Sequence, residues 1–217
     1  MNKLIIGNKN YSSWSLRPWI LMKEVGIPFE EVRIPLFQAG YKAELLKHSP
    51  SGKVPAFCTD RLTVWDSLAI CEYVAELYPA KGCWPDDREA RALARSVSHE
   101  MHSGFFEIRN ALPMNCRKQT EMSNSSSELQ SEIDRICEIW GSCRHLFFNE
   151  GDFLFGRFST ADAMYAPVVL RFNSYGIKIG DSQRAYMEAI MSLGSMQEWL
   201  AEAVKEKEFI PEYDAEV

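Results

Sequence analysis

The sequence has no long uninterrupted apolar run: no window approaches the roughly 18 apolar residues of a membrane-spanning helix. The opening segment MNKLIIGNKN has too short an apolar stretch for a secretory signal peptide. Basic clusters are also missing, and 24 Lys and Arg against 30 Asp and Glu give a formal net charge of −6. This balance argues against nucleic acid or a membrane surface as the main partner. We therefore expect a cytoplasmic protein.

Paired cysteines are missing as well. The six cysteines form no CxxC pair and are spread too thinly for a disulfide scaffold, so we expect reduced thiols. His99 and His102 raise the hypothesis of a zinc site, but no cysteine lies at a finger-like spacing from them. Ordinary helix side chains are the preferred interpretation of this pair, and no metal is expected.

What the chain does contain is a change of pattern near residue 78. Before it, short apolar runs alternate with helical patterns, which predicts the order βαβ followed by ββα. The expected strands are 4–7, 30–36, 55–59 and 62–65, and the expected helices are 15–25, 43–48 and 66–78. The segment 79–87, with two prolines and a glycine, is typical of a linker.

Beyond this linker the strand signals disappear and helical patterns take over. One pattern runs from 88 to Pro113, and another begins at a capping box formed by Ser159 and Asp162. A final helix is expected over about 183–206. The sequence thus predicts an α/β domain over 1–78, a linker over 79–87 and an all-helical domain over 88–217.

Three hydroxyls, Ser12, Ser13 and Ser15, crowd the turn where the first strand gives way to a helix. One of them suffices as a helix cap. A hydroxyl beside the free N–H groups and the positive end of a helix dipole favours an anion. Capping alone is the plainer interpretation of the surplus.

Two further segments have binding chemistry. Pro55, directly before a strand, fits an edge position or a cis Val54–Pro55 bond, and a cis bond would leave the Val54 backbone free to pair with an extended peptide. In WDSLAI, Asp66 and Ser67 open a helix, where they would bind the ammonium and the carboxylate of a free amino-acid end. Taken alone, each segment is more often an ordinary edge strand or helix cap.

Taken together, these segments resemble the glutathione transferase superfamily. SSWSLR is similar to the SSCSxR signature of the zeta class, with Trp14 in place of the cysteine. The family's Val–Pro segment is similar to KVPAF, and its acidic-Ser-x-Ala-Ile helix is similar to DSLAICEYVAELYP. The capping box of its helical domain is similar to STADA. EMHSGFFEIRNALPMN resembles a bacterial subset. The motifs occur in the family's order over nearly the whole chain.

The resemblance implies a thioredoxin-like N-terminal domain that binds glutathione and a C-terminal domain of five or six helices. It implies that Ser12 activates the glutathione thiol as in the zeta class, with Ser13, at the serine-to-arginine spacing of the theta and delta classes, as the alternative. Ser15 is then left as the helix cap. Because no cysteine lies in this loop, a thiol–disulfide role is not expected.

The resemblance also implies a pocket for the electrophile between the domains. Its expected lining residues are Met101, Phe105, Arg109 and Met114, although a stripe at this spacing is more often core. Arg109 hints at an anionic substrate. Lys42 and Lys53 are candidates for the carboxylates of glutathione, with solvated lysines as the alternative.

The function expected from these observations is glutathione transfer to a small electrophile by a homodimer. The alternative is the zeta-class maleylacetoacetate isomerase of aromatic amino-acid breakdown. Trp14 and the replacement of an arginine pair by Asn173 and Ser174, with Arg171 nearby but out of register, depart from that class. A second alternative is a protein that binds glutathione or other ligands without catalysis.

Overall fold

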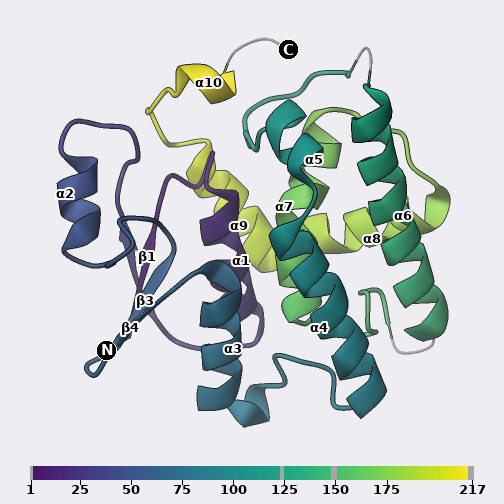
Figure 1. The fold of residues 1–217 in the computed structure, drawn as a ribbon, viewed down its shortest axis with the longest axis horizontal. Coiled ribbons are helices and arrows are strands. Elements are labelled where there is room, and N and C mark those ends of the chain that lie inside the picture. The colour runs from purple at the N-terminus through teal and green to yellow at the C-terminus, as the bar shows by residue number, and fades with distance from the viewer. Residues whose placement is uncertain (1, 123–124, 148–150, 215–217) are drawn as a thin grey trace.

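The computed structural model describes residues 2–122, 125–147 and 151–214, whose arrangement is shown in Figure 1. The first part forms a small sheet with helices: β1 (Lys3–Ile6), α1 (Ser13–Glu24), β2 (Glu30–Arg33), α2 (Tyr41–Leu46), β3 (Ala56–Cys58), β4 (Thr63–Trp65) and α3 (Ser67–Leu77). A 3-10 turn at Pro79–Lys81 follows. Then come α4 (Arg88–Ser103), α5 (Phe106–Ala111), α6 (Ser127–Phe147), α7 (Thr160–Ser174), α8 (Asp181–Ser192), α9 (Gly194–Ala203) and α10 (Pro211–Asp214).

The sheet has the strand order β2-β1-β3-β4. β1 and β2 are parallel and are connected through α1, whereas β3 pairs antiparallel with both β1 and β4. In register, Leu4 lies opposite Glu31 on one side and Phe57 on the other. This is the βαβ–ββα order that the sequence predicts. Helices α1 and α3 lie between the strands and the C-terminal helices (Figure 1). The starts of both helices therefore face the helical part of the chain.

The helical part departs from the sequence-based expectation at two points. The pattern from 88 to Pro113 is broken between α4 and α5, where Phe105 takes a left-handed conformation (φ 59°) after the extended Gly104. The expected last helix is two helices, because Leu193 is extended (ψ 135°). The capping box of α7 is confirmed: Ser159 Oγ accepts a hydrogen bond from Ala161 N, and Asp162 accepts one from Ser159 N at 2.9 Å.

Helix α7 is the centre of the packing. It is buried over nearly its whole length, as expected for a helix that is apolar on all sides. α1 packs against α7 as well as against α3, and α7 also packs against α4. One hydrophobic core therefore runs from Leu4 in the sheet to Trp199 in α9. The division into domains at 79–87 stays a prediction.

The loop between β1 and α1 is anchored by Lys9, which is almost completely buried. Its ammonium lies 4.7 Å from the ring centroid of Trp19 and 5.4 Å from that of Trp199, and it forms ion pairs with Glu31 and Glu202. A buried charge needs such partners, since an unpaired one is very costly. The loop that leads to the three serines is thereby fixed to α9.

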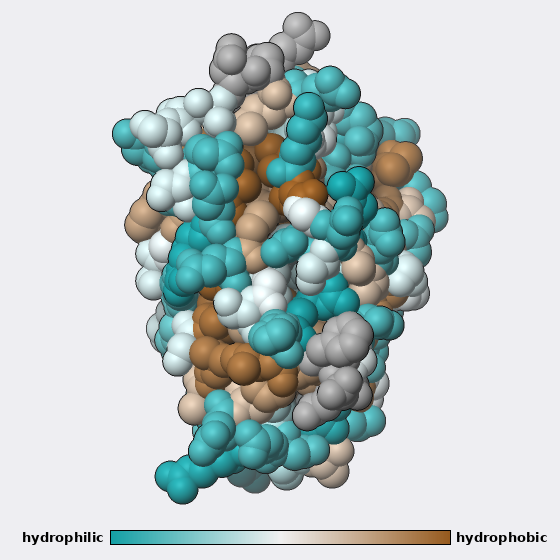
Figure 2. Space-filling model, turned by 90° about the vertical axis from the view of Figure 1, so that its right-hand side faces the viewer, coloured by the Kyte–Doolittle hydropathy of each residue, from teal (hydrophilic) through white to brown (hydrophobic). Residues whose placement is uncertain are grey.

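No helix in the described part of the chain is both long and apolar enough to cross a membrane. Figure 2 shows the α6 side of the molecule, where hydrophilic side chains cover much of the surface and apolar side chains gather in separate areas. Leu146 on α6 is one of the exposed large apolar residues.

Candidate active site

Ser12, not Ser15, caps helix α1. The Ser12 hydroxyl donates to Ser15 Oγ at 2.7 Å and accepts a hydrogen bond from Ser15 N at 3.4 Å. Ser15 Oγ also accepts a hydrogen bond from Gly7 N at 3.1 Å, so it connects the first turn of α1 to the end of β1. The expectation that Ser15 is the cap is therefore wrong. Both hydroxyls have structural partners here.

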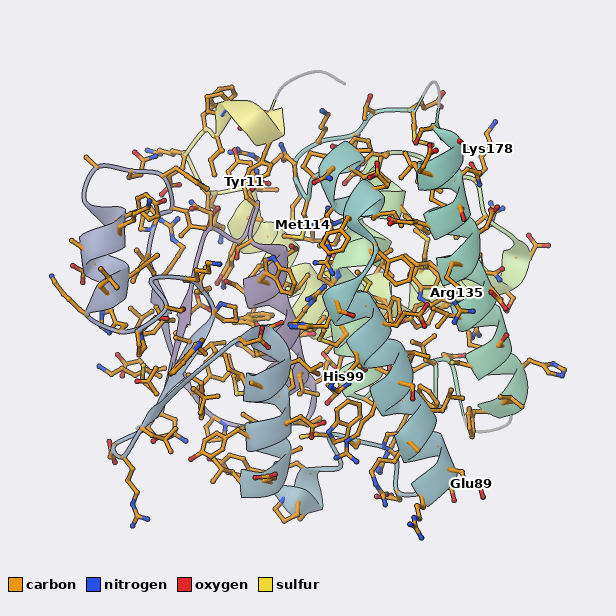
Figure 3. The ribbon with its side chains drawn as sticks, in the orientation of Figure 1. Tyr11, Glu89, His99, Met114, Arg135 and Lys178 are labelled. Atoms are coloured by element: carbon orange, nitrogen blue, oxygen red, sulfur yellow. The ribbon has the colours of Figure 1, made fainter. Side chains whose placement is uncertain are left out.

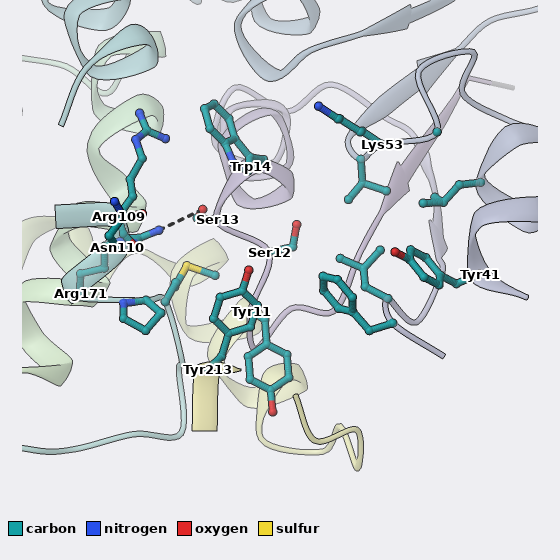
Figure 4. A pocket seen from close by; sticks show the side chains of 17 residues that line it. Tyr11, Ser12, Ser13, Trp14, Tyr41, Lys53, Arg109, Asn110, Arg171 and Tyr213 are labelled. Carbon is teal, nitrogen blue, oxygen red and sulfur yellow. Dashed lines mark hydrogen bonds between the residues drawn. The ribbon is translucent and has the colours of Figure 1, made fainter. Parts of the chain in front are cut away.

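Ser13 has a different kind of partner. Its hydroxyl oxygen accepts a hydrogen bond from Arg171 Nη2 at 3.2 Å, drawn as the dashed line in Figure 4. Arg171, on α7, is itself held through Nη1 by the carbonyl of Leu112 at 2.6 Å. A guanidinium group only donates hydrogen bonds, so this contact leaves the hydrogen of the Ser13 hydroxyl available to an acceptor.

A cavity of about 590 Å³ lies where α1 meets the helical part. It is lined by Tyr11, Ser12, Ser13, Trp14, Leu36, Phe37, Tyr41, Leu45, Gly52, Lys53, Val54, Arg109, Asn110, Pro113, Met114, Arg171 and Tyr213. Figure 4 shows Ser12 and Ser13 between the side with Lys53 and Tyr41 and the side with Arg109 and Arg171. In Figure 3, Tyr11 and Met114 lie between the sheet and the helices of the C-terminal part. We call this space the main cavity.

A second cavity, of about 520 Å³, lies beside the N-terminus of α3. Its lining residues are Trp14, Ser51, Lys53, Val54, Pro55, Trp65, Asp66 and Ser67. Trp14, Lys53 and Val54 line both cavities, so the two spaces adjoin along these three residues. The Val54–Pro55 peptide bond is cis, one of the two conformations that the sequence allowed.

Asp66 and Ser67 occupy the wall of the second cavity in different ways. Asp66 caps α3, since its Oδ1 accepts hydrogen bonds from Leu68 N at 3.0 Å and Ala69 N at 3.2 Å. Its φ is positive (76°, with ψ 133°), which is uncommon for a residue with a side chain. The Ser67 hydroxyl is buried and has no hydrogen-bond partner in the described part of the chain. A buried polar group without a partner is costly and points to a missing ligand.

Three guanidinium groups surround this region. Those of Arg17 and Arg109 lie 4.2 and 4.6 Å from the ring centroid of Trp14, and Arg171 contacts Ser13. Burial lowers the pKa of Arg17 to about 9, with Arg109 and Arg171 as further causes. Within the described residues, none of the three forms an ion pair with a carboxylate. The site is therefore electrostatically positive.

The predicted site residues are only partly brought together. Arg109 and Met114 line the main cavity, whereas Met101 and Phe105 are buried in the hydrophobic core and line neither cavity. Lys53 lines both cavities and Lys42 neither. Their expected roles in binding stay predictions.

Sequence reasoning missed Tyr11, Asn110 and Tyr213 in the main cavity. The Tyr11 hydroxyl donates to Asp214, on the short helix α10, and the Tyr11 and Tyr213 rings stack with centroids 5.8 Å apart. Tyr11 directly precedes Ser12, which was a usable signal. No local pattern connected Tyr213 to the site.

Comparison with known proteins gives a consistent result. The family model of the glutathione S-transferase N-terminal domain matches residues 11–77. Maleylacetoacetate isomerase from Rattus norvegicus is 32% identical over 124 residues, which are 56% of this chain and 55% of that protein. The chain thus matches about half the length of such curated relatives.

The solved structures extend the likeness to nearly the whole chain. A glutathione transferase homologue from Burkholderia, solved with bound glutathione, is 25% identical, with a TM-score of 0.68 over 94% of this chain and 98% of that one. Glutathione transferase F2 from Populus trichocarpa has a TM-score of 0.70 at 19% identity, over 95% of this chain and 100% of that one. The expected fold, a thioredoxin-like part followed by a helical part, is confirmed.

Proposed function

Because the chain belongs to the cytosolic glutathione transferase superfamily, we propose that it binds glutathione and activates its thiol for attack on a small electrophile. The observation that carries this proposal is the meeting of two cavities at Trp14, Lys53 and Val54. Hydroxyls at the start of α1 line one cavity, and the start of α3 lines the other. This arrangement fits a tripeptide whose two ends differ in chemistry.

The residues of the second cavity fit the amino-acid end of glutathione. The unpartnered Ser67 hydroxyl would donate to the carboxylate, next to the positive end of the α3 dipole. Asp66 Oδ2 is not used in capping α3 and would accept from the ammonium. The backbone of Val54 would pair with the peptide, as an added strand does. Glutathione would supply the reactive thiol itself.

The thiol would then lie in the main cavity beside α1. A free thiol with a pKa near 8.5 is only about 3% thiolate at pH 7. Lowering its pKa by about two units takes about 2.7 kcal/mol of preferential thiolate stabilisation. A hydroxyl donor to a charged sulfur contributes roughly 1.5–3 kcal/mol, and the α1 dipole adds roughly 0.3–1 kcal/mol.

We assign the activating hydroxyl to Ser13 in preference to Ser12, which is the residue that the zeta-class motif favours. The Ser12 hydrogen is used in the bond to Ser15, whereas the Ser13 hydroxyl accepts from Arg171 and keeps its hydrogen. The Arg171 guanidinium polarises the Ser13 hydroxyl and strengthens it as a donor. In the reaction, the thiol loses its proton to solvent, the thiolate sulfur forms a bond to the electrophilic carbon, and the leaving group departs with its bonding electrons.

Maleylacetoacetate isomerase activity is the second candidate. It is favoured by Arg109 and Arg171 in the lining of the main cavity, because two cations suit a substrate with more than one carboxylate. Trp14 in place of the zeta-class cysteine speaks for the general transferase. A non-catalytic binding protein, the third candidate, would need no hydroxyl with a free hydrogen next to Arg171.

The test is calorimetric binding of glutathione followed by turnover with a panel of haloaromatic, peroxide and maleyl electrophiles. Binding with conjugation of a haloaromatic supports the transferase, and turnover of the maleyl compound alone supports the isomerase. Binding without turnover identifies a binding protein. No binding at millimolar glutathione contradicts the proposal.

We further propose a cytoplasmic homodimer with domains 1–78 and 88–217. Sedimentation tests the homodimer, and limited proteolysis tests the two domains.

A further inference from the structure

His102 lies in the last turn of α4 and contacts two residues that line the second cavity. Its Nε2 is 3.1 Å from Asp66 Oδ2, and its ring meets that of Trp14 edge-on with centroids 5.4 Å apart. His102 itself does not line either cavity. His102 therefore lies outside the second cavity and connects α4 to two of the residues that form its wall.

The hydrogen-bond pattern determines where the His102 proton lies. A carboxylate only accepts hydrogen bonds, so a neutral His102 carries its proton on Nε2 and donates it to Asp66 Oδ2. The other oxygen of Asp66 is already bound by Leu68 N and Ala69 N. Together these three donors fix both oxygens of the carboxylate. Oδ2 still keeps a lone pair for a ligand.

We propose that His102 is a positioning residue for glutathione, which holds Asp66 in the orientation that accepts the ammonium of the tripeptide. This inference rests on the proposed function, because it concerns the same site. Without His102, only Oδ1 of Asp66 would be held, and Oδ2 could take other positions. Glutathione binding would then have to fix the orientation of this carboxylate, which costs affinity. The effect should therefore appear in glutathione affinity and not in the chemical step.

The charge state of His102 follows from its surroundings. Burial lowers the pKa of His102, whereas Asp66, the cap of α3, raises it. Arg17 on α1, Arg109 on α5 and His99 on α4 lower it further. The imidazole is therefore neutral at pH 7. Below this lowered pKa the imidazole gains a proton, and its positive charge offsets that of Asp66 and repels the ligand's ammonium. Glutathione affinity should weaken as the pH falls through the lowered pKa of His102.

The experiment compares His102→Leu with His102→Gln and with the control His99→Leu. His99 lies on the same helix, is exposed, and its Nδ1 bonds to the carbonyl of Arg95 at 2.8 Å (Figure 3). Leu removes the donor at a similar volume, whereas the Gln amide keeps one. We expect His102→Leu to raise the Kd and KM for glutathione about five- to tenfold, with kcat within about twofold. His102→Gln should recover most of the affinity without its acid-dependent loss, and His99→Leu should match the parent protein in glutathione affinity at pH 7.

The outcomes separate this inference from the proposed function. If the parent protein binds no glutathione, the proposed function falls and the role of His102 falls with it. If the parent binds glutathione but His102→Leu binds it equally well, only the role of His102 is wrong. The role is also wrong if Leu and Gln weaken binding alike, or if the acid-dependent loss of affinity persists in His102→Gln.

Discussion

Replacing Ser13 by alanine separates thiol activation from helix capping. The substitution removes the hydroxyl that we assign to the thiolate, while Arg171 keeps its bond to the Leu112 carbonyl, so the fold should survive. The matched control is Ser12→Ala, one residue earlier. It removes the cap of α1 and its bond to Ser15 but leaves the Ser13–Arg171 pair intact.

The magnitudes for the two variants differ in kind. Losing a donor to a charged sulfur costs roughly 1.5–3 kcal/mol, which raises the pKa of the bound thiol by about one to two units. With a parent midpoint near pH 6.5, the thiolate fraction and hence turnover at pH 7 should therefore fall by about three- to twenty-five-fold in Ser13→Ala. Ser12→Ala should lose about 0.5–2 kcal/mol of unfolding free energy, with turnover within about twofold of the parent.

The assay is the pH dependence of kcat/KM for conjugation of a haloaromatic, with denaturant unfolding in parallel. In Ser13→Ala the rise of kcat/KM with pH should move to higher pH. Ser13→Ala and Ser12→Ala should reach the same plateau of kcat/KM in strong base. Ser13→Thr, which keeps a hydroxyl, should restore part of the activity. The reasoning is refuted if Ser12→Ala shows the pH shift and Ser13→Ala does not.

Three further predictions concern the surrounding structure. Asp162→Ala should lower the unfolding free energy by about 2–6 kcal/mol, because the buried N–H groups of Leu154 and Ser159 lose their acceptor. An unchanged midpoint in a denaturant titration would contradict this. Arg109→Met should lower kcat/KM about tenfold for a carboxylate-bearing electrophile and leave a neutral one within about twofold, and an equal loss for both would refute an electrostatic role. Trp14→Ala should join the two cavities and favour a bulky over a small electrophile by about tenfold in competition assays, a preference that an unchanged product ratio would rule out.

The order of strands and helices was predictable because it rests on local patterns. The hydrogen bonds at the Ser12–Ser15 turn were only partly predictable. Serine suits the cap and the first turn alike, and the structure uses Ser15 in the first turn to accept a hydrogen bond from Gly7 N, directly after β1. Sequence reasoning placed the three serines at the strand-to-helix turn but chose the wrong cap.

Long-range contacts explain what the sequence could not provide. Arg171 contacts Ser13 across 158 positions of the chain. His99 and His102 have the same local setting on α4, yet one bonds within its own helix and the other reaches Asp66. Such pairings depend on how the helices pack, which local patterns do not contain.

The central claim is that bound glutathione is held as a thiolate at the start of α1. Ultraviolet titration of the thiol in the saturated complex tests it most directly. The account predicts a midpoint about two units below that of free glutathione, near pH 6.5. A midpoint equal to that of the free tripeptide would contradict it, even if glutathione binds tightly.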